Sequence, residues 1–125
     1  MGIFNRSKGS EITQELIALK FKISEVPQKF QTGASVFGAG EGKAQEQIPI
    51  ICTVIDDTVK ALKTGLDIHN RPITKSQITD GLKRLVAATR QPAFIGLVSV
   101  VLNPDGIIEL EKYMKELERI ANRIK

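Results

Sequence analysis

The most apolar segment of this chain reads Ala93-Phe94-Ile95-Gly96-Leu97-Val98-Ser99-Val100-Val101-Leu102, with one hydroxyl and no charge. Burial of so much apolar surface is strongly favourable, so we expect the remainder of the chain to cover this segment. Pro92 precedes it, and Asn103-Pro104-Asp105-Gly106 follows it. Proline and glycine punctuate secondary structure, so the ends of the element are marked while its conformation stays open.

Two conformations suit the segment. As a strand, its β-branched residues fit a pleated sheet, and Asn-Pro-Asp-Gly is a strong turn sequence that returns the chain through Ile107 and Ile108 as a hairpin. As a helix, the segment starts at Pro92, and Asn103 caps a further helix with Pro104 at its first position. Periodicity cannot decide between them, because the segment is apolar on all sides.

Composition indicates a single domain with an aliphatic core. The chain has 125 residues, of which 42% are hydrophobic, with five Phe, one Tyr and no Trp. This length supports one core and leaves little for a second. The scarcity of aromatic side chains argues against a platform on which nucleic-acid bases stack. The sequence shows no secretory signal and no apolar run of transmembrane length, so we expect a cytoplasmic protein.

Two segments carry apolar residues at heptad spacing, which is typical of helices that pack along a seam. The first seam consists of Ile12, Leu16, Leu19, Ile23, Val26 and Phe30. The second seam consists of Ile107, Leu110, Met114, Leu117, Ala121 and Ile124. Ser10 is a suitable N-cap for the first helix, and Pro27 should kink or end it near Glu25. The seams can pair within one chain or with a second copy, so a homodimer is one of our expectations.

Two further helices are expected between the seams. One spans Ile48 to Ile68 and tolerates Pro49 in its first turn, although a strand over residues 50–55 fits the same β-branched side chains. The other spans Thr74 to Gln91 and carries an apolar face.

The remaining segments complete the predicted organisation. Residues 1–9 are interpreted as a flexible basic arm, and residues 33–42 as a glycine-rich loop within a single helical domain that spans residues 10–125. We therefore predict a mainly α protein, a compact bundle of four or five helices. One β-hairpin at residues 94–110 is the variant.

Catalytic and metal-binding constellations are missing from the sequence. Cys52 lies in an apolar run, which indicates a buried and unreactive thiol. The only histidine, His69, has no neighbouring His or Cys to complete a zinc site and is expected in a surface loop. Gly42-Lys43 ends the glycine-rich loop, but Ala44 stands where a P-loop requires Ser or Thr. We expect no enzymatic activity, metal, cofactor, small-molecule ligand or membrane partner.

The excess positive charge is concentrated between residues 60 and 90, where the net charge of +5 exceeds the +4 of the whole chain. The seven cations of this segment are Lys60, Lys63, Arg71, Lys75, Lys83, Arg84 and Arg90. Such a segment can attract nucleic-acid phosphates or an acidic protein, and it also fits a solvated helix face.

Within the basic segment, Ser76-Gln77-Ile78-Thr79-Asp80-Gly81-Leu82-Lys83-Arg84-Leu85 resembles the recognition helix of winged-helix DNA-binding domains. The shared positions are a Ser, a β-branched apolar residue, a Ser or Thr, and two leucines. The resemblance implies a DNA-binding helix, a wing with its tip at residues 103–106, and a dimerising C-terminal helix. The candidate nucleic-acid-binding residues are Lys75, Ser76, Thr79, Lys83, Arg84 and Arg90.

The expected function is therefore that of a non-enzymatic binding protein whose partner is nucleic acid. The alternative is a protein–protein assembly or adaptor protein, of the viral structural, immunity or scaffold type. Such a protein would act through its amphipathic helices without nucleic acid.

Overall fold

A computed structural model describes the backbone of residues 2–30 and 41–124 and the side chains of residues 10–30 and 45–124. Within these residues the chain forms helices and no β-strand, which confirms the predicted mainly α class. The helices are α1 (Gly2–Lys29), α2 (Glu41–Thr64), α3 (Lys75–Thr89), α4 (Pro92–Val98) and α5 (Pro104–Arg123).

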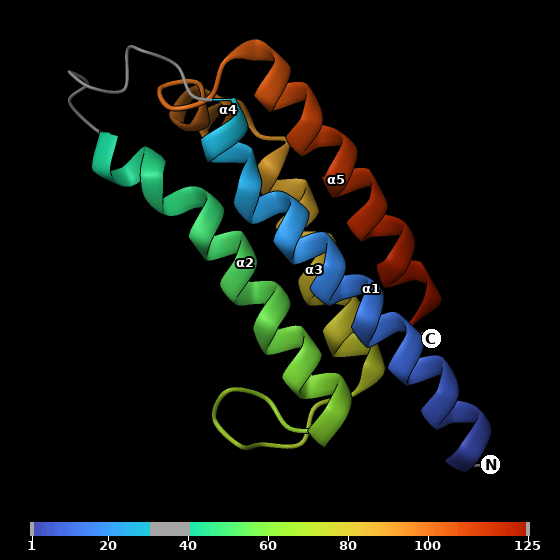
Figure 1. The fold of residues 1–125 in the computed structure, drawn as a ribbon. Helices are drawn as coiled ribbons and strands as arrows, with labels where there is room; N and C mark the ends of the chain where they lie inside the picture. Colours follow the sequence, from blue (N-terminus) through green and yellow to red (C-terminus); the bar gives the residue numbers. More distant parts are fainter. Residues whose placement is uncertain (1, 31–40, 125) are drawn as a thin grey trace.

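Four of these helices form a bundle in which neighbours run antiparallel (Figure 1). α1 packs against α2 and α5, and α3 packs against the same two helices from the other side. Two contacts fix the direction of α5 relative to α1. Arg123, at the end of α5, pairs with Glu15 in the middle of α1, and the amide of Asn103, before the start of α5, donates to the carbonyl of Phe30, just past the end of α1, at 2.9 Å. α4 lies at one end of the bundle, against α2 and α3.

Both predicted seams face the core. The buried hydrophobic side chains of α1 are Ile12, Leu16, Leu19, Ile23 and Val26, and those at the second seam are Leu110, Met114, Leu117, Ala121 and Ile124. Because α1 packs directly on α5, the two seams pair within the chain. α2 and α3 close the core with Ile51, Ile55, Ile78, Leu82 and Val86.

The most apolar segment adopts the helical alternative, and the hairpin variant at residues 94–110 is wrong. α4 begins at Pro92, and α5 begins after Asn103, whose side chain accepts a hydrogen bond from the amide of Gly106 at 2.9 Å. Asn103 thus satisfies an amide that a helix start leaves free, and Pro104 occupies the first helical position, where its missing N–H is harmless. The wing implied by the winged-helix resemblance is therefore not formed.

This segment is also less buried than expected. Val98, Val101 and Leu102 are buried, whereas the side chains of Phe94 and Ile95 stay half-exposed. The reason is the position of α4: a short helix at the end of a bundle turns only one side toward the core. The two heptad seams supply more of the buried hydrophobic residues than the most apolar segment does.

Three helix boundaries differ from the sequence-based predictions. α1 starts at Gly2, so the segment assigned to a flexible arm is helical and Ser10 is no N-cap. α1 also continues past Pro27, since the amide of Phe30 still donates to Val26. α2 starts at Glu41, which places Pro49 inside the helix and excludes the strand alternative over residues 50–55. Packing of the buried faces of α1 and α2 outweighs the destabilising effect of Pro27 and Pro49 on the helix backbone.

Residues 33–40 of the predicted glycine-rich loop lie outside the described residues, and residues 41–42 belong to α2. In the described part of the chain, no helix has both the length and the apolar character needed to cross a membrane.

Candidate nucleic-acid interface

The start of α3 is set by a capping box. The Thr74 side chain accepts from the amide of Gln77 at 3.1 Å, and the Gln77 side chain accepts from the amide of Thr74 at 2.9 Å. This reciprocal pair satisfies two amides at the helix start. It leaves Lys75 and Ser76 exposed in the first turn, while Ile78 begins the buried face.

The structure separates the six predicted site residues into two groups. Lys75, Ser76 and Arg84 are exposed and Lys83 is half-buried, and none of the three cations forms an ion pair with a described carboxylate. Thr79 is only 3% exposed, and its hydroxyl donates to the carbonyl of Ala121 in α5 at 3.5 Å. Nucleic acid therefore cannot reach Thr79, which lies at the edge of the apolar face.

Arg90 is already engaged at the end of α3. Its guanidinium lies 3.2 Å from Glu118 Oε1 of α5. Helical spacing places Lys83 and Arg90 on one side of α3, but it turns Arg84 about 100° away from Lys83. The cations of α3 therefore do not line a single continuous basic face.

A more coherent group of cations surrounds the loop between α2 and α3. Hydrogen bonds close this loop: Gly65 donates to Ala61 at 2.8 Å, and Ile73 donates to Gly65 at 3.0 Å. Leu66 and Pro72 form an antiparallel bridge. Because the two ends of the loop meet, the end of α2 and the start of α3 lie side by side (Figure 1).

Asp67 holds the loop in shape. Its carboxylate accepts from the amides of His69 and Arg71 at 2.8 and 3.0 Å, and Asn70 adopts a left-handed backbone conformation with φ of 60°. The hydrogen bonds from these amides, that of Arg71 above all, lower the pKa of the Asp67 carboxyl below its usual range. His69 is exposed in the loop, as predicted.

We call the cations around this loop the basic end, which consists of Lys60, Lys63, Arg71 and Lys75. All four side chains are exposed, and none forms an ion pair with a carboxylate of the described residues. The nearby Asp67 is occupied by backbone amides. Of the basic end, the sequence-based site included only Lys75, although the charge count over residues 60–90 signalled all four.

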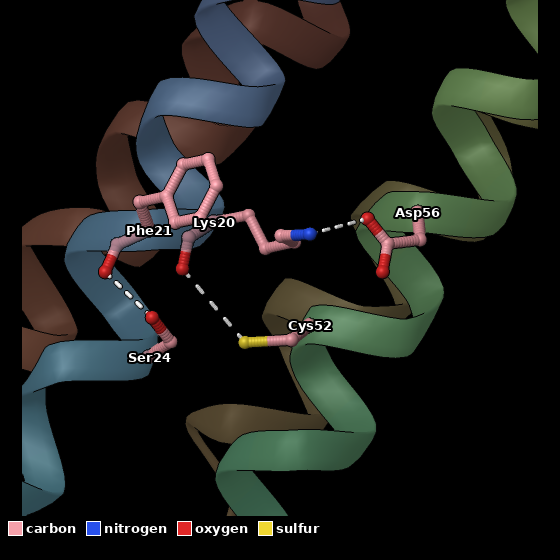
Figure 2. A network of polar contacts seen from close by, with 5 residues as sticks. All are labelled: Lys20, Phe21, Ser24, Cys52 and Asp56. Carbon is pink, nitrogen blue, oxygen red and sulfur yellow. Dashed lines mark hydrogen bonds and ion pairs between the residues drawn. The ribbon is translucent and has the colours of Figure 1, made fainter.

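A second group of polar side chains joins α1 to α2 (Figure 2). Lys20 Nζ lies 2.9 Å from Asp56 Oδ1 and 5.1 Å from the centre of the Phe21 ring. The Cys52 thiol donates to the carbonyl of Lys20 at 3.8 Å, and burial raises its pKa. The thiol therefore stays protonated at neutral pH and is a poor nucleophile. This group is a contact between helices, and Asp56 gains a partner that lies 36 residues away in sequence.

A cavity of about 130 Å³ lies between α3, α4 and α5. Its apolar lining consists of Phe94, Ile95, Val98, Ile107, Leu110 and Met114. Charged side chains occur only at the exposed residues around it, namely Arg90, Glu111 and Lys115. In the part of the chain that the structure describes, no three potential metal ligands lie together.

The fold and its surface define a four-helix bundle with a basic end and an apolar cavity. Models of protein families, curated proteins and solved structures were compared with the chain, and none of them matches it.

Proposed function

We propose that this bundle is a non-enzymatic protein that binds nucleic acid through its basic end. The observation that carries the proposal is the gathering of four exposed cations around one ordered loop, with no ion pair to any carboxylate whose side chain the structure describes. Unpaired Lys and Arg side chains attract phosphates and release counterions when they bind them. The loop keeps Arg71 beside the end of α2, so little ordering is required before binding.

The chemistry of this end favours contacts to the phosphate backbone over contacts to base edges. Lys and Arg reach phosphates from many directions, and such contacts position a protein without reading the sequence. Phe21, Phe30, Phe94 and Tyr113 lie away from the basic end on α1, α4 and α5 or at their ends, so they offer no stacking platform there. Binding should therefore be tolerant of sequence and sensitive to salt.

Salt dependence provides the test. With roughly four phosphate contacts, the log of the binding constant for duplex DNA should fall with the log of salt concentration with a slope of about −3 to −4. Lys63→Ala together with Lys75→Ala should flatten the slope by about two, because each lost phosphate contact removes about one unit. Fluorescence anisotropy with a mixed-sequence duplex at several salt concentrations measures both values.

The matched control removes the same charge elsewhere. Lys22→Ala with Lys112→Ala deletes two exposed lysines of α1 and α5 and should leave the slope unchanged. A third protein, Lys83→Ala with Arg84→Ala, tests the surface of α3. If this variant flattens the slope and the Lys63/Lys75 variant does not, the contact lies on α3 and not at the basic end. No binding at low salt would contradict the nucleic-acid proposal altogether.

Assembly with a protein is the second candidate function. It is supported by large apolar side chains that the bundle leaves at its surface, with exposed fractions from 49% to 64%. These side chains are Phe21, Ile50, Ile68 and Ile108.

A further inference from the structure

One carboxylate, Asp67, lies in the loop of the basic end. It is the only acid between Lys60 and Lys75, the stretch that holds all four cations of this surface. None of those cations forms an ion pair with it. Like charges repel, so by charge alone a carboxylate at this place weakens the binding of a phosphate. The hydrogen bonds of Asp67 indicate a different role.

Four hydrogen bonds join Asp67 to the backbone of the residues that follow it. The carboxylate accepts from the amides of His69 and Arg71 at 2.8 and 3.0 Å. The amide of Asp67 donates to the carbonyl of Arg71 at 2.8 Å, and its carbonyl accepts from the amide of Asn70 at 3.0 Å. Because Arg71 is bonded to Asp67 through both its amide and its carbonyl, the backbone of this cation is fixed relative to Asp67.

Burial contributes little to the order of this part of the loop. Residues 68–71 are all exposed, and the antiparallel bridge of Leu66 and Pro72 lies outside them, at the base of the loop. Asn70 has φ of 60°, a left-handed conformation that asparagine adopts more readily than most other residues with a side chain. The conformation of the loop tip therefore depends mainly on the hydrogen bonds of Asp67.

We infer that Asp67 is a positioning residue of the basic end, which fixes Arg71 in the free protein so that nucleic acid meets a preformed set of cations. The inference rests on the proposed function and names the residue that prepares its site. Ordering a backbone residue opposes binding, so a loop that is ordered beforehand gives a tighter complex. Asp67 thus favours the binding of phosphates in spite of its negative charge.

Fluorescence anisotropy with a mixed-sequence duplex at one low salt concentration tests the sign of this effect. Asp67→Ala should weaken binding by roughly tenfold, which corresponds to ordering about one backbone residue again in the complex. Asp80→Ala is the matched control, because it removes the same charge from an exposed position on α3 outside the loop. This control should bind as tightly as the wild type or more tightly. A role of Asp67 by charge alone would make both variants bind more tightly.

Variants that change a single property separate the hydrogen bonds of the loop from its charge. Asp67→Asn keeps an oxygen that accepts from both amides and removes the negative charge, so it should bind at least as tightly as the wild type. Asn70→Val leaves the charge unchanged and disfavours the left-handed backbone, so it should weaken binding as Asp67→Ala does. Asn70→Gly tolerates that backbone and should stay close to the wild type.

NMR relaxation of the backbone nitrogens measures the order of the loop without nucleic acid. The order parameters of residues 68–71 should be about 0.85 in the wild type and in Asp67→Asn, and they should fall below about 0.6 in Asp67→Ala. Circular dichroism checks that each variant keeps the helical bundle.

The inference is overturned if Asp67→Ala binds as tightly as Asp80→Ala, if Asp67→Asn fails to restore binding, or if the loop keeps its order in Asp67→Ala. In each of these cases the binding of the wild type and its dependence on Lys63 and Lys75 still stand, so the proposed function survives. A wild-type chain that binds no duplex while its loop is ordered overturns the proposed function, and the effect of Asp67 on binding with it.

Discussion

At the scale of single residues, Tyr113 shows how one turn of helix changes the chemistry of a side chain. Its hydroxyl donates to Glu109 Oε2 at 2.7 Å, and this hydrogen bond, together with burial and the charge of Glu109, raises the pKa of Tyr113 to about 12. The protonated form is favoured in the folded protein. The resulting contribution to stability is complete below the ordinary pKa near 10 and is lost as the pH rises through about 12.

Absorbance of tyrosinate measures this effect directly, because the chain contains one Tyr and no Trp. We expect a midpoint near 12 in the folded protein and near 10 in denaturant. Glu109→Gln should lower the folded midpoint toward 10, since it removes the negative charge that disfavours tyrosinate. Glu111→Gln is the control and should not move the midpoint. A midpoint that Glu109→Gln leaves in place would contradict the role of this hydrogen bond.

At the scale of elements, the helix starts differ in how far the local sequence specifies them. The start of α3 depends on the capping box of Thr74 and Gln77. The start of α5 depends on the Asn103 side chain, which accepts a hydrogen bond from the amide of Gly106 three residues later. Such caps can be predicted because all their atoms belong to one turn. The extent of α1 and α2 could not be predicted in this way, because Pro27 and Pro49 remain inside helices that packing holds together.

Pro49 provides a test of this balance. It lies in the interior of α2, where proline supplies no N–H to the helix and its ring crowds the preceding turn. Pro49→Ala should raise the free energy of unfolding by roughly 1 to 3 kcal/mol. Pro104→Ala is the control, because proline at the first position of α5 is favourable and its loss should bring no gain. Equal effects of the two variants in denaturant unfolding would contradict the helical environment of Pro49.

At the scale of the whole molecule, the pairing of α1 with α5 closes the core. Leu117 is fully buried at this contact region, among side chains that join the two ends of the sequence. The bundle thus depends on a contact between its first and last helices. Loss of packing there should therefore destabilise the entire fold.

Leu117→Ala should lower the free energy of unfolding by roughly 2 to 5 kcal/mol, because truncation of a buried leucine loses apolar contact and leaves a cavity. Ile50→Ala removes a half-exposed side chain and should have a clearly smaller effect. Urea unfolding followed by circular dichroism compares the two variants. A loss below about 0.5 kcal/mol for Leu117→Ala would show that the residue is not part of the core.

The candidate site illustrates the limit of local patterns at this same scale. The excess of cations over residues 60–90 was evident from counting charges, and so was the apolar face of α3. The sequence did not show that Thr79 is buried against Ala121 or that Arg90 pairs with Glu118. Ala121 and Glu118 both lie on α5, far from α3 in sequence. The basic end likewise depends on the loop hydrogen bonds, which bring the end of α2, with Lys63, beside the start of α3, with Lys75.

The sequence by itself determined the mainly helical class and the two seams, since each depends on spacing within one element, and it offered the Asn103 cap of α5 as one of two alternatives. Only the tertiary structure decided that the seams pair within the chain and that the most apolar segment lies half-covered at one end of the bundle. Burial and pairing of this kind depend on the direction of each helix and on which helices become neighbours. Those relations join residues far apart in sequence, and no periodicity within a single helix contains them.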